Sequence, residues 1–526
     1  MRLPLPSTPC LAGLLAFAAL CLTGDPVRLL SWDTLLHVHL GERMLDQGAL
    51  VETDPSSWAT DRRYIDHEWL PQLALGVSRR AFGLEGLVIF TALAVGATFS
   101  LLAAWMRRRG VGPPVVLALL AGGFVALKPF FFARPFLVSW FLAVLWTLLL
   151  ERLSRGELEG PRWLAAAAAS MFVWVNLHGG FFLAFFLLAV FGLAQVWRIV
   201  TAPSATAASA AEGGEERRSA TRLLLWMAIG GNLSLMVSGL NVYGFRLHAH
   251  FLSYLMNARL ITSIAEWQAP FFHDRSQLAL LLFLGFSLVV ALAGPRRLTP
   301  PELLLVVALL LAALKAQRNL PFFVLLTLPI AGVQLEGLLA ELAAVPSVAA
   351  RPARWVAALS RRAAAGEGRR RGALTAAAVL ALGVLAVGVW KIRPIDLGRK
   401  FPVAAASFVS DHPELFGGRM FNLYDWGGYL AWALYPDHRV FINGLQDHYG
   451  EAHYLEYREV LFVRPLWQRI LDQRRIDWII VSGPSPLTAM LVLQPGWRRV
   501  YRDPMAEIFV RRDAAGAAEA AAASGV

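Results

Sequence analysis

Residues 31–69, between the first two apolar segments, gather side chains capable of acid–base chemistry in a chain that has few ionisable groups. If the backbone is helical from Asp33 to Leu45, then Asp33 and His37 lie four residues apart and share a face. A carboxylate beside an imidazole is the usual equipment of general acid–base catalysis. We therefore identify Asp33 as the candidate catalytic base and His37 as its catalytic neighbour.

Three other interpretations of this stretch remain open from the sequence. An amphipathic helix on the membrane surface, with a solvated polar face, would show the same pattern. Asp33 could instead cap the helix, a role that Asn fills about equally well. A hard divalent cation, Mg²⁺ or Mn²⁺, could also be held here by oxygen and imidazole ligands, and its candidate ligands are Asp33, Asp54, His67 and Glu68.

The composition is that of a polytopic membrane protein. The 526 residues are 57% hydrophobic and only 16% charged, whereas soluble domains are about 25% charged. By the hydropathy rule there are about eleven runs long enough to cross a bilayer, near 9–30, 85–106, 112–131, 135–151, 162–177, 180–200, 222–240, 276–294, 302–317, 319–338 and 372–391. The predicted fold is a mainly α transmembrane helix bundle.

The net charge of +12 is a topology pattern and does not indicate a nucleic-acid partner. The basic residues fall into five groups between alternate spans, namely Arg107 to Arg109, Arg152 with Arg155, Arg198 with Arg217 and Arg218, Arg296 with Arg297, and Arg351 through Arg371. The positive-inside rule puts all five groups in the cytoplasm. The loop 31–69, the segment 241–275 and everything after residue 391 then face the other side.

Several outward-facing segments carry further candidate substrate-binding residues. Cations there run against the positive-inside trend, and guanidinium groups match phosphate oxygens bidentately. Snorkelling of the cations and a structural role for His178 are the alternatives. The candidates are Asp54, His67, Glu68, Lys128, Arg134, His178, Arg246, Glu266, Lys315 and Arg318. Arg246 shares a helical face with His250, so that both could point at one anion.

The chain divides into a bundle over residues 1–394, which includes the outer loop 31–84, a small extracytoplasmic α/β domain over 395–513, and a disordered tail over 514–526. In the α/β domain the predicted strands are RMFNL, HRVFI, DWIIVS, RRVYRD and AEIFVRR, and the predicted helices are 402–411, 426–434 and 451–475. The Ser/Ala/Gly/Glu-rich stretch 201–221 is predicted to be a flexible cytoplasmic linker.

The outer-loop motifs resemble those of the GT-C integral-membrane glycosyltransferases. They are Asp33-x-x-x-His37 with Gly41, Asp54-Pro55-Ser56, Glu68-Trp69-Leu70, WVNLHGGF at 174–181, NVYG at 241–244, AEW at 265–267 and QRN at 317–319. In the terminal domain, DWGGYL at 425–430 and VFING at 440–444 resemble bacterial members with a small external domain. The acid pair of protein O-mannosyltransferases is absent, because Thr34 follows Asp33.

This resemblance implies a polyprenyl-phosphate-linked sugar as donor, membrane lipid around the bundle, and a glycan, lipid or protein as acceptor. It also implies a bacterial inner (plasma) membrane, with the active site and the terminal domain on the extracytoplasmic side. A noncatalytic envelope assembly or scaffold protein, and a transporter of lipid-linked substrates, are the competing function classes.

Overall fold

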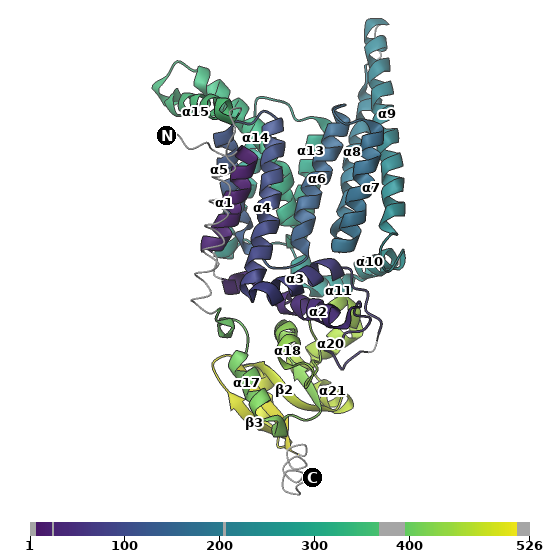
Figure 1. Ribbon diagram of the computed structural model, residues 1–526, viewed down its shortest axis with the longest axis vertical. Helices are drawn as coiled ribbons and strands as arrows, with labels where there is room; N and C mark the ends of the chain where they lie inside the picture. The colour runs from purple at the N-terminus through teal and green to yellow at the C-terminus, as the bar shows by residue number, and fades with distance from the viewer. Residues whose placement is uncertain (1–6, 24–25, 61, 204–206, 368–394, 513–526) are drawn as a thin grey trace.

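The computed structural model describes residues 7–23, 26–60, 62–203, 207–367 and 395–512. A bundle of long helices forms one end of the molecule and a small α/β unit forms the other (Figure 1). The predicted last span, 372–391, and the predicted tail lie outside the described residues.

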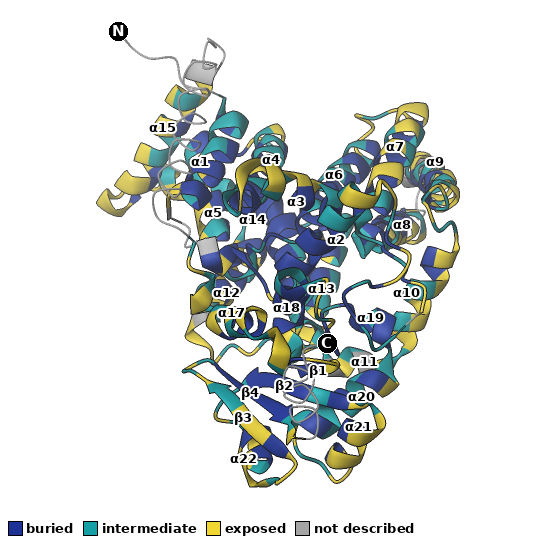
Figure 2. Cartoon of the chain, turned by 60° about the horizontal axis from the view of Figure 1, so that its bottom comes forward, coloured by how far each residue is buried: buried dark blue, intermediate teal, exposed yellow. Residues whose placement is uncertain are grey.

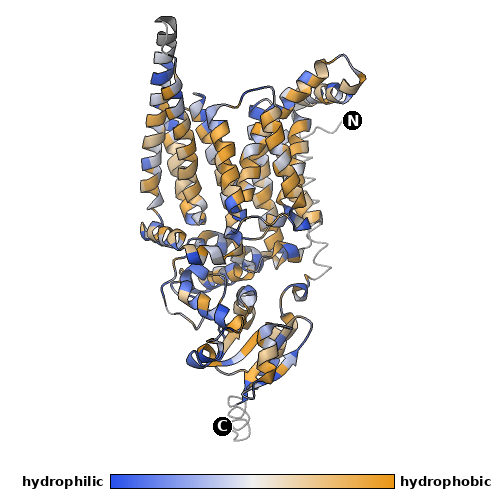
Figure 3. Ribbon diagram, turned by 180° about the vertical axis from the view of Figure 1, so that it is seen from behind, coloured by the Kyte–Doolittle hydropathy of each residue, from blue (hydrophilic) through white to orange (hydrophobic). Residues whose placement is uncertain are grey.

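The bundle helices follow the predicted spans. They are α1 (Thr8–Thr23), α4 (Glu85–Arg108), α5 (Pro113–Leu127), α6 (Phe136–Ser154), α7 (Gly160–Leu177), α8 (Phe182–Thr201), α9 (Ala207–Ser238), α12 (Leu278–Ala293), α13 (Pro300–Lys315) and α14 (Leu320–Ala344). Among the described residues, six helical segments are long and apolar enough to cross a membrane, and two more are apolar but shorter. Their apolar surfaces form a continuous band (Figure 3). The prediction of a mainly α polytopic bundle is confirmed.

One predicted linker is a helix. The stretch 201–221 was expected to be flexible, but α9 begins at Ala207 and continues directly into the apolar segment. Ala, Glu and Arg dominate this stretch, and all three are strong helix formers. Their helix propensity outweighs the low complexity on which the linker prediction depended.

Two helices of the first outer loop lie across the end of the bundle. They are α2 (Thr34–Gln47) and α3 (Trp69–Phe82), and the short helices α10 (Arg246–Met256) and α11 (Ala258–Ser263) lie at the same end (Figure 1). A Cβ at Gly41 of α2 would meet the carbonyl oxygen of Gln72 at 1.9 Å. Only glycine permits this approach of the two backbones, which brings the polar side chains of α2 and α3 together.

The terminal unit is a four-stranded sheet with helices. Its strands are β1 (Arg419–Asn422), β2 (Ile476–Ser482), β3 (Trp497–Arg502) and β4 (Ala506–Arg511), in the order β1-β2-β4-β3. The β1–β2 pair is parallel and the other two pairs are antiparallel. Its helices are α17 (Val403–Asp411), α18 (Gly427–Leu434), α19 (Gln446–Tyr449), α20 (Glu451–Leu461), α21 (Trp467–Gln473) and α22 (Pro486–Leu493).

The predicted strand HRVFI, residues 438–442, is wrong. Val440 forms only an isolated bridge with Ser57 of the first loop. The amide of Phe441 donates to the side-chain oxygen of Asn422 at 2.8 Å, so this backbone is satisfied outside the sheet. The predicted helix 451–475 is interrupted, because Pro465 lies between α20 and α21 and cannot continue a helix.

Two hydrophobic cores organise the chain. One lies inside the bundle, and the other joins the first outer loop to the terminal unit, with Leu36 of α2 and Phe421 of β1 both fully buried in it. A Cβ at Gly428 would lie 2.8 Å from the carbonyl oxygen of Trp32, so α18 packs directly against the start of α2. The buried residues accordingly run from α2 through α18 into the sheet (Figure 2). We therefore propose that the terminal unit and the first loop fold as one body.

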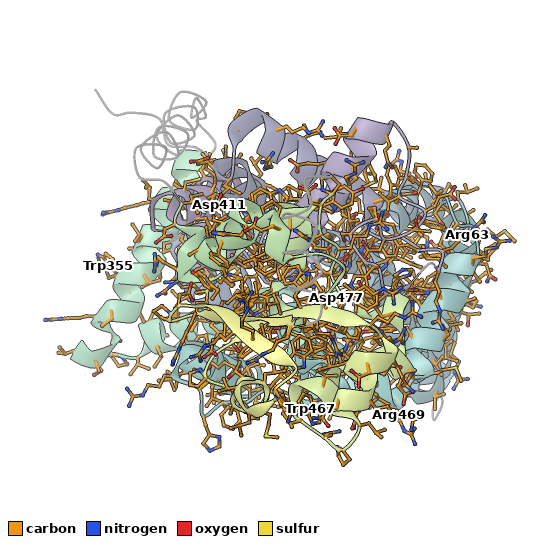
Figure 4. All side chains as sticks on the ribbon, turned by 90° about the horizontal axis from the view of Figure 1, so that it is seen from below. Arg63, Trp355, Asp411, Trp467, Arg469 and Asp477 are labelled. Atoms are coloured by element: carbon orange, nitrogen blue, oxygen red, sulfur yellow. The ribbon has the colours of Figure 1, made fainter. Side chains whose placement is uncertain are left out.

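The opposite end of the bundle is basic. The helix α15 (Arg351–Glu367) lies there (Figure 1), and its Trp355 is 66% exposed at the edge of the molecule (Figure 4). The helices α2 and α3 and the terminal sheet are thus separated from the Arg-rich loops by the length of the bundle.

Candidate active site

Asp33 lies immediately before α2 and points toward the bundle. Asp33 occupies the N-cap position, but its carboxylate makes no capping hydrogen bond to the helix. Instead, its Oδ2 lies 3.3 Å from Nη2 of Arg134. Nη1 of the same guanidinium donates to Oε1 of Glu266 at 2.5 Å. Arg134 belongs to the turn before α6, and Glu266 to the short helix η4 (Ala265–Trp267). We call these three residues the Asp33 cluster.

Burial and the charge of Arg134 together set the electrostatics of the Asp33 cluster. Burial raises the pKa of Asp33, against the opposing charge of Arg134. The Arg134 guanidinium lowers the pKa of Glu266, so Glu266 is the ionised partner that holds the arginine. A carboxylate with a raised pKa is a stronger proton acceptor than an ordinary one, which suits Asp33 to act as a base.

Glu68 is the centre of a second cluster, in which three imidazoles converge on one carboxylate. His178 Nε2 lies 3.2 Å from Glu68 Oε1, His37 Nδ1 lies 3.6 Å from Oε2, and His67 Nε2 lies 3.8 Å from Oε1. Burial lowers the pKa of His37 to about 4. Burial alone would raise the pKa of Glu68, but the surrounding imidazoles outweigh it and lower that pKa well below its usual range. We call this group the Glu68 cluster.

Asp66 supports the Glu68 cluster from behind. Its Oδ1 accepts hydrogen bonds from Gln72 Nε2 at 3.0 Å and from the Glu68 amide at 3.0 Å. The Gln72 side chain also lies 3.5 Å from Nδ1 of His37. Burial raises the pKa of Asp66 to about 8, so this carboxyl is largely protonated at neutral pH. It therefore positions Glu68 and His37 without adding a full charge.

The predicted pair Asp33 and His37 is divided between the two clusters. Asp33 contacts Arg134, whereas His37 contacts Glu68 and Gln72. The clusters interact through their charges, because the charge of Glu68 raises the pKa of Asp33.

Arg318 lies on the short helix η6 (Gln317–Asn319) at the same end of the bundle. Its guanidinium carbon lies 4.3 Å from the ring centroid of Trp267. It forms no ion pair with any described residue, yet its charge helps to lower the pKa of Glu266. Arg318 is therefore a cation beside the Asp33 cluster that keeps its hydrogen-bond donors for a ligand.

Three further predicted cations are exposed. Lys128 directly follows α5, Lys315 is the last residue of α13, and Arg246 is the first residue of α10. Arg246 and His250 do not point together at one anion site here, because His250 Nε2 lies 2.8 Å from Oδ2 of Asp447. None of the three cations is within ion-pair distance of the described carboxylates.

Asp54 is buried and surrounded by donors. Its carboxylate accepts from the Ser56 amide at 2.9 Å, the Ser56 hydroxyl at 2.6 Å, Asn443 Nδ2 at 2.8 Å and the Tyr449 hydroxyl at 3.1 Å. It thereby ties the first loop to the terminal unit.

The four residues proposed from the sequence as metal ligands do not gather around one point. Asp54 is engaged with the terminal unit, Asp33 with Arg134, and Glu68 with imidazoles. In the part of the chain that the structure describes, no group of three or more His, Cys, Asp or Glu side chains has the arrangement of a metal site.

Lys400 was not predicted and lies beside the Asp33 cluster. Its Nζ lies 4.6 Å from the ring centroid of Trp32 and donates to the carbonyl oxygen of Leu30. Its charge lowers the pKa of Asp33 slightly against burial. The pattern that could have identified it is the one used for Arg318, a cation on the side that the positive-inside rule depletes.

Comparison with known proteins rests on structure alone. No protein-family model matches the sequence, and no curated protein matches it. Taken together, the bundle, the polar outer loops and the terminal unit define a polytopic membrane protein with a buried charged site at one end.

Two solved structures of an oligosaccharyltransferase from Archaeoglobus fulgidus share this fold. One is archaeal AglB in complex with an inhibitory peptide and a dolichol-phosphate, with a TM-score of 0.54 and 12% identity over 90% of this chain and 69% of that chain. The other, in complex with Zn and sulfate, has a TM-score of 0.52 and 11% identity over 90% and 68%. ArnT from Cupriavidus metallidurans, bound to undecaprenyl phosphate, has a TM-score of 0.49 and 15% identity over 94% and 97%. The chain has the GT-C fold.

Proposed function

We propose that the chain is a membrane glycosyltransferase that moves a sugar from a polyprenyl-phosphate donor to an acceptor on the extracytoplasmic side, with Asp33 as the base. The observation that carries this proposal is the state of the Asp33 carboxylate. It is partly buried at the end of the bundle, with 23% of its side chain exposed, has a raised pKa, and is engaged by one guanidinium instead of by the helix that it precedes.

In the proposed reaction Asp33 takes the proton of an acceptor hydroxyl. The acceptor oxygen then bonds to the anomeric carbon of the sugar, and the bond from that carbon to the phosphate oxygen breaks. The phosphate leaves with the bonding electron pair and stays attached to its prenyl chain in the lipid. General bases contribute about 10²- to 10⁴-fold to such steps.

Arg318 is the main phosphate contact in this proposal. Its guanidinium is stacked on Trp267 and has no carboxylate partner among the described residues, so its donors can meet the phosphate oxygens bidentately. Arg134 holds Asp33 and Glu266 in place. Lys128 and Lys315, exposed at the same end of the bundle, would attract the anionic donor from the lipid surface.

The Glu68 cluster supports the base. Glu68 acts on Asp33 through its charge, and the rings of His37 and His178 lie against the Glu68 carboxylate at 3.6 and 3.2 Å. His37 is therefore a positioning residue in this proposal.

The fold shared with AglB supports a lipid-phosphate donor, since that structure contains a dolichol-phosphate. We further propose a bacterial plasma membrane, with this end of the bundle outside the cytoplasm. Reporter fusions at residues 60, 260 and 450 should then be active in the periplasm, and fusions at 110, 210 and 360 should be inactive there. A cytoplasmic residue 450 would contradict the placement.

The function is tested with purified chain in nanodiscs and a panel of polyprenyl-phosphate hexoses and pentoses, with release of polyprenyl phosphate as the readout. Wild-type protein should consume at least one donor. The Arg318→Ala variant should lose donor affinity and turnover by roughly 10- to 100-fold, because it lacks a charge-assisted contact made in both the ground and transition states.

Arg469→Ala is the matched control for Arg318→Ala. Arg469 is exposed on α21 of the terminal unit (Figure 4). Its replacement should therefore leave donor affinity and turnover unchanged. Equal effects of the two variants, or no consumption of any donor by a folded wild-type protein, would overturn the proposal.

A further inference from the structure

A pocket of about 600 Å³ opens between the start of α2 and the terminal sheet. Its lining is made by Trp32, Gly398, Lys400, Leu423, Asp425, Trp426, Ser482, Gly483, Asp503, Pro504 and Met505. Pockets that bind small organic ligands have volumes of roughly 300–1,000 Å³. The space is therefore large enough for a sugar or a short oligosaccharide.

The sheet topology explains why polar groups meet at this pocket. The strands β1 and β2 are parallel, so their carboxyl ends lie at the same edge of the sheet. Asp425 follows β1, Ser482 ends β2, and Asp503 lies in the turn from β3 to β4. Ligands of α/β sheets typically bind outside the carboxyl ends of the parallel strands.

Two of these polar groups are unused by the protein. Neither the Asp425 carboxylate nor the Ser482 hydroxyl forms a hydrogen bond or an ion pair with a described residue. Asp503 is held in a fixed orientation, since it accepts from the Tyr501 hydroxyl at 2.6 Å and from the amides of Met505 and Ala506 at 2.7 and 2.6 Å. The pocket thus presents hydrogen-bond acceptors to a ligand that brings hydroxyl donors.

The charge of the lining separates this pocket from the donor site. Asp425 and Asp503 outnumber the single cation, Lys400, so a phosphate group is disfavoured here, whereas Arg318 favours one at the bundle. Trp32, which is 36% exposed, adds an aromatic surface of the kind that packs against the C–H faces of a sugar ring.

The pocket is next to the proposed base. Trp32 directly precedes Asp33, and the charge of Asp33 acts on both Asp425 and Lys400. We propose that this pocket binds the acceptor and that the acceptor is an uncharged, hydroxyl-rich saccharide. This inference depends on the proposed function for the direction of transfer but not for the binding itself.

The test measures binding of neutral mono- to tetrasaccharides to the full chain in nanodiscs, by saturation-transfer NMR and by quenching of tryptophan fluorescence. At least one saccharide should bind. Asp425→Ala should weaken that binding by about tenfold, because a charged hydrogen-bond acceptor is lost, and Asp425→Asn should weaken it less. Ser482→Ala should weaken it by several-fold and is a mild variant that tests the pocket even if Asp425→Ala does not fold.

The control is Asp411→Ala, which removes an exposed carboxylate at the end of α17 (Figure 4) and should bind the saccharide as wild type does. Binding that is insensitive to both Asp425→Ala and Ser482→Ala would overturn the pocket assignment, as would a chain that binds short peptides or inorganic phosphate there but no saccharide.

The pocket and the proposed function fail in different ways. Saccharide binding that depends on Asp425, with no consumption of any polyprenyl-phosphate donor, would support the pocket and contradict the transferase. Donor consumption that continues in the Asp425→Ala variant with an unchanged KM for every saccharide acceptor would contradict the pocket alone.

Discussion

Two aspartates of the first outer loop, Asp33 and Asp54, have opposite environments. Asp54 is 3% exposed and accepts four hydrogen bonds, two of them from Asn443 and Tyr449 of the terminal unit. Asp33 accepts no capping hydrogen bond and is engaged by the guanidinium of Arg134. The oxygens of Asp54 are thus occupied by structural hydrogen bonds, whereas Asp33 has few partners and a raised pKa, which suits it to accept a proton.

The two hydrophobic cores also differ, in the elements that form them. The core of the bundle is formed by helices that the lipid would surround, and the outer core joins α2 to the terminal sheet. The site lies where these cores meet, so its side chains come from elements that belong to different cores.

The largest expected effect on folding is that of Asp54→Ala. It should lower the free energy of unfolding by about 3–5 kcal/mol, because the variant leaves several buried donors without an acceptor. Thermal unfolding of the purified protein in detergent measures this. Asp46→Ala is the control, since Asp46 is 47% exposed and pairs with Arg80 at the surface, and it should cost less than about 1 kcal/mol. If Asp54→Ala unfolds as wild type does, then the hydrogen bonds of Asp54 do not stabilise the fold as proposed.

Arg134→Gln should change the site more than the fold. It leaves the carboxylates of Asp33 and Glu266 close together without their cation, and we expect turnover to fall by roughly 10- to 100-fold. Arg134→Lys keeps the charge but loses the bidentate geometry. Its turnover should therefore lie between that of Arg134→Gln and that of wild type. The measurement is the rate of polyprenyl phosphate release at saturating donor. An unaffected rate would mean that Arg134 does not position the base.

The smallest of these effects is a pH dependence from His37. Burial lowers its pKa to about 4, against about 6.5 in an unfolded chain, so folding favours the neutral ring. Its contribution to stability is then fully present above pH 6.5 and is lost as the pH falls from 6.5 toward 4. Between pH 7 and pH 5 the free energy of unfolding of wild type should fall by roughly 2 kcal/mol more than that of His37→Gln. Parallel unfolding curves for the two proteins over this range would contradict the burial of a neutral imidazole.

The sequence predicted most of the bundle helices but not the contacts between distant side chains. Apolar run length predicted the bundle helices, and the spacing of polar residues predicted α2 with Asp33 at its start. It could not show that Arg134 is the cation that pairs with Asp33, because that contact spans about a hundred residues and has no local periodicity. The same holds for Asp54 and Asn443, which are 389 positions apart.

Local strand propensity gave a wrong prediction where contacts with distant residues determine the backbone conformation. Residues 438–442 have the composition of a strand, but their backbone bonds with Asn422 and with the first loop. The imidazoles of His37, His67 and His178 come from three separate segments, so their convergence on Glu68 depends on the close approach of Gly41 to Gln72 and on the end of α7.

The most direct test of the account is the Asp33→Asn variant in the donor-consumption assay. Asn keeps the size of the side chain and removes its capacity to take a proton. With a folded protein and saturating donor and acceptor, the account predicts that turnover falls by about 10²- to 10⁴-fold while donor affinity stays within about threefold of wild type. Near-normal sugar transfer by the folded Asp33→Asn protein would contradict the assignment of Asp33 as the base.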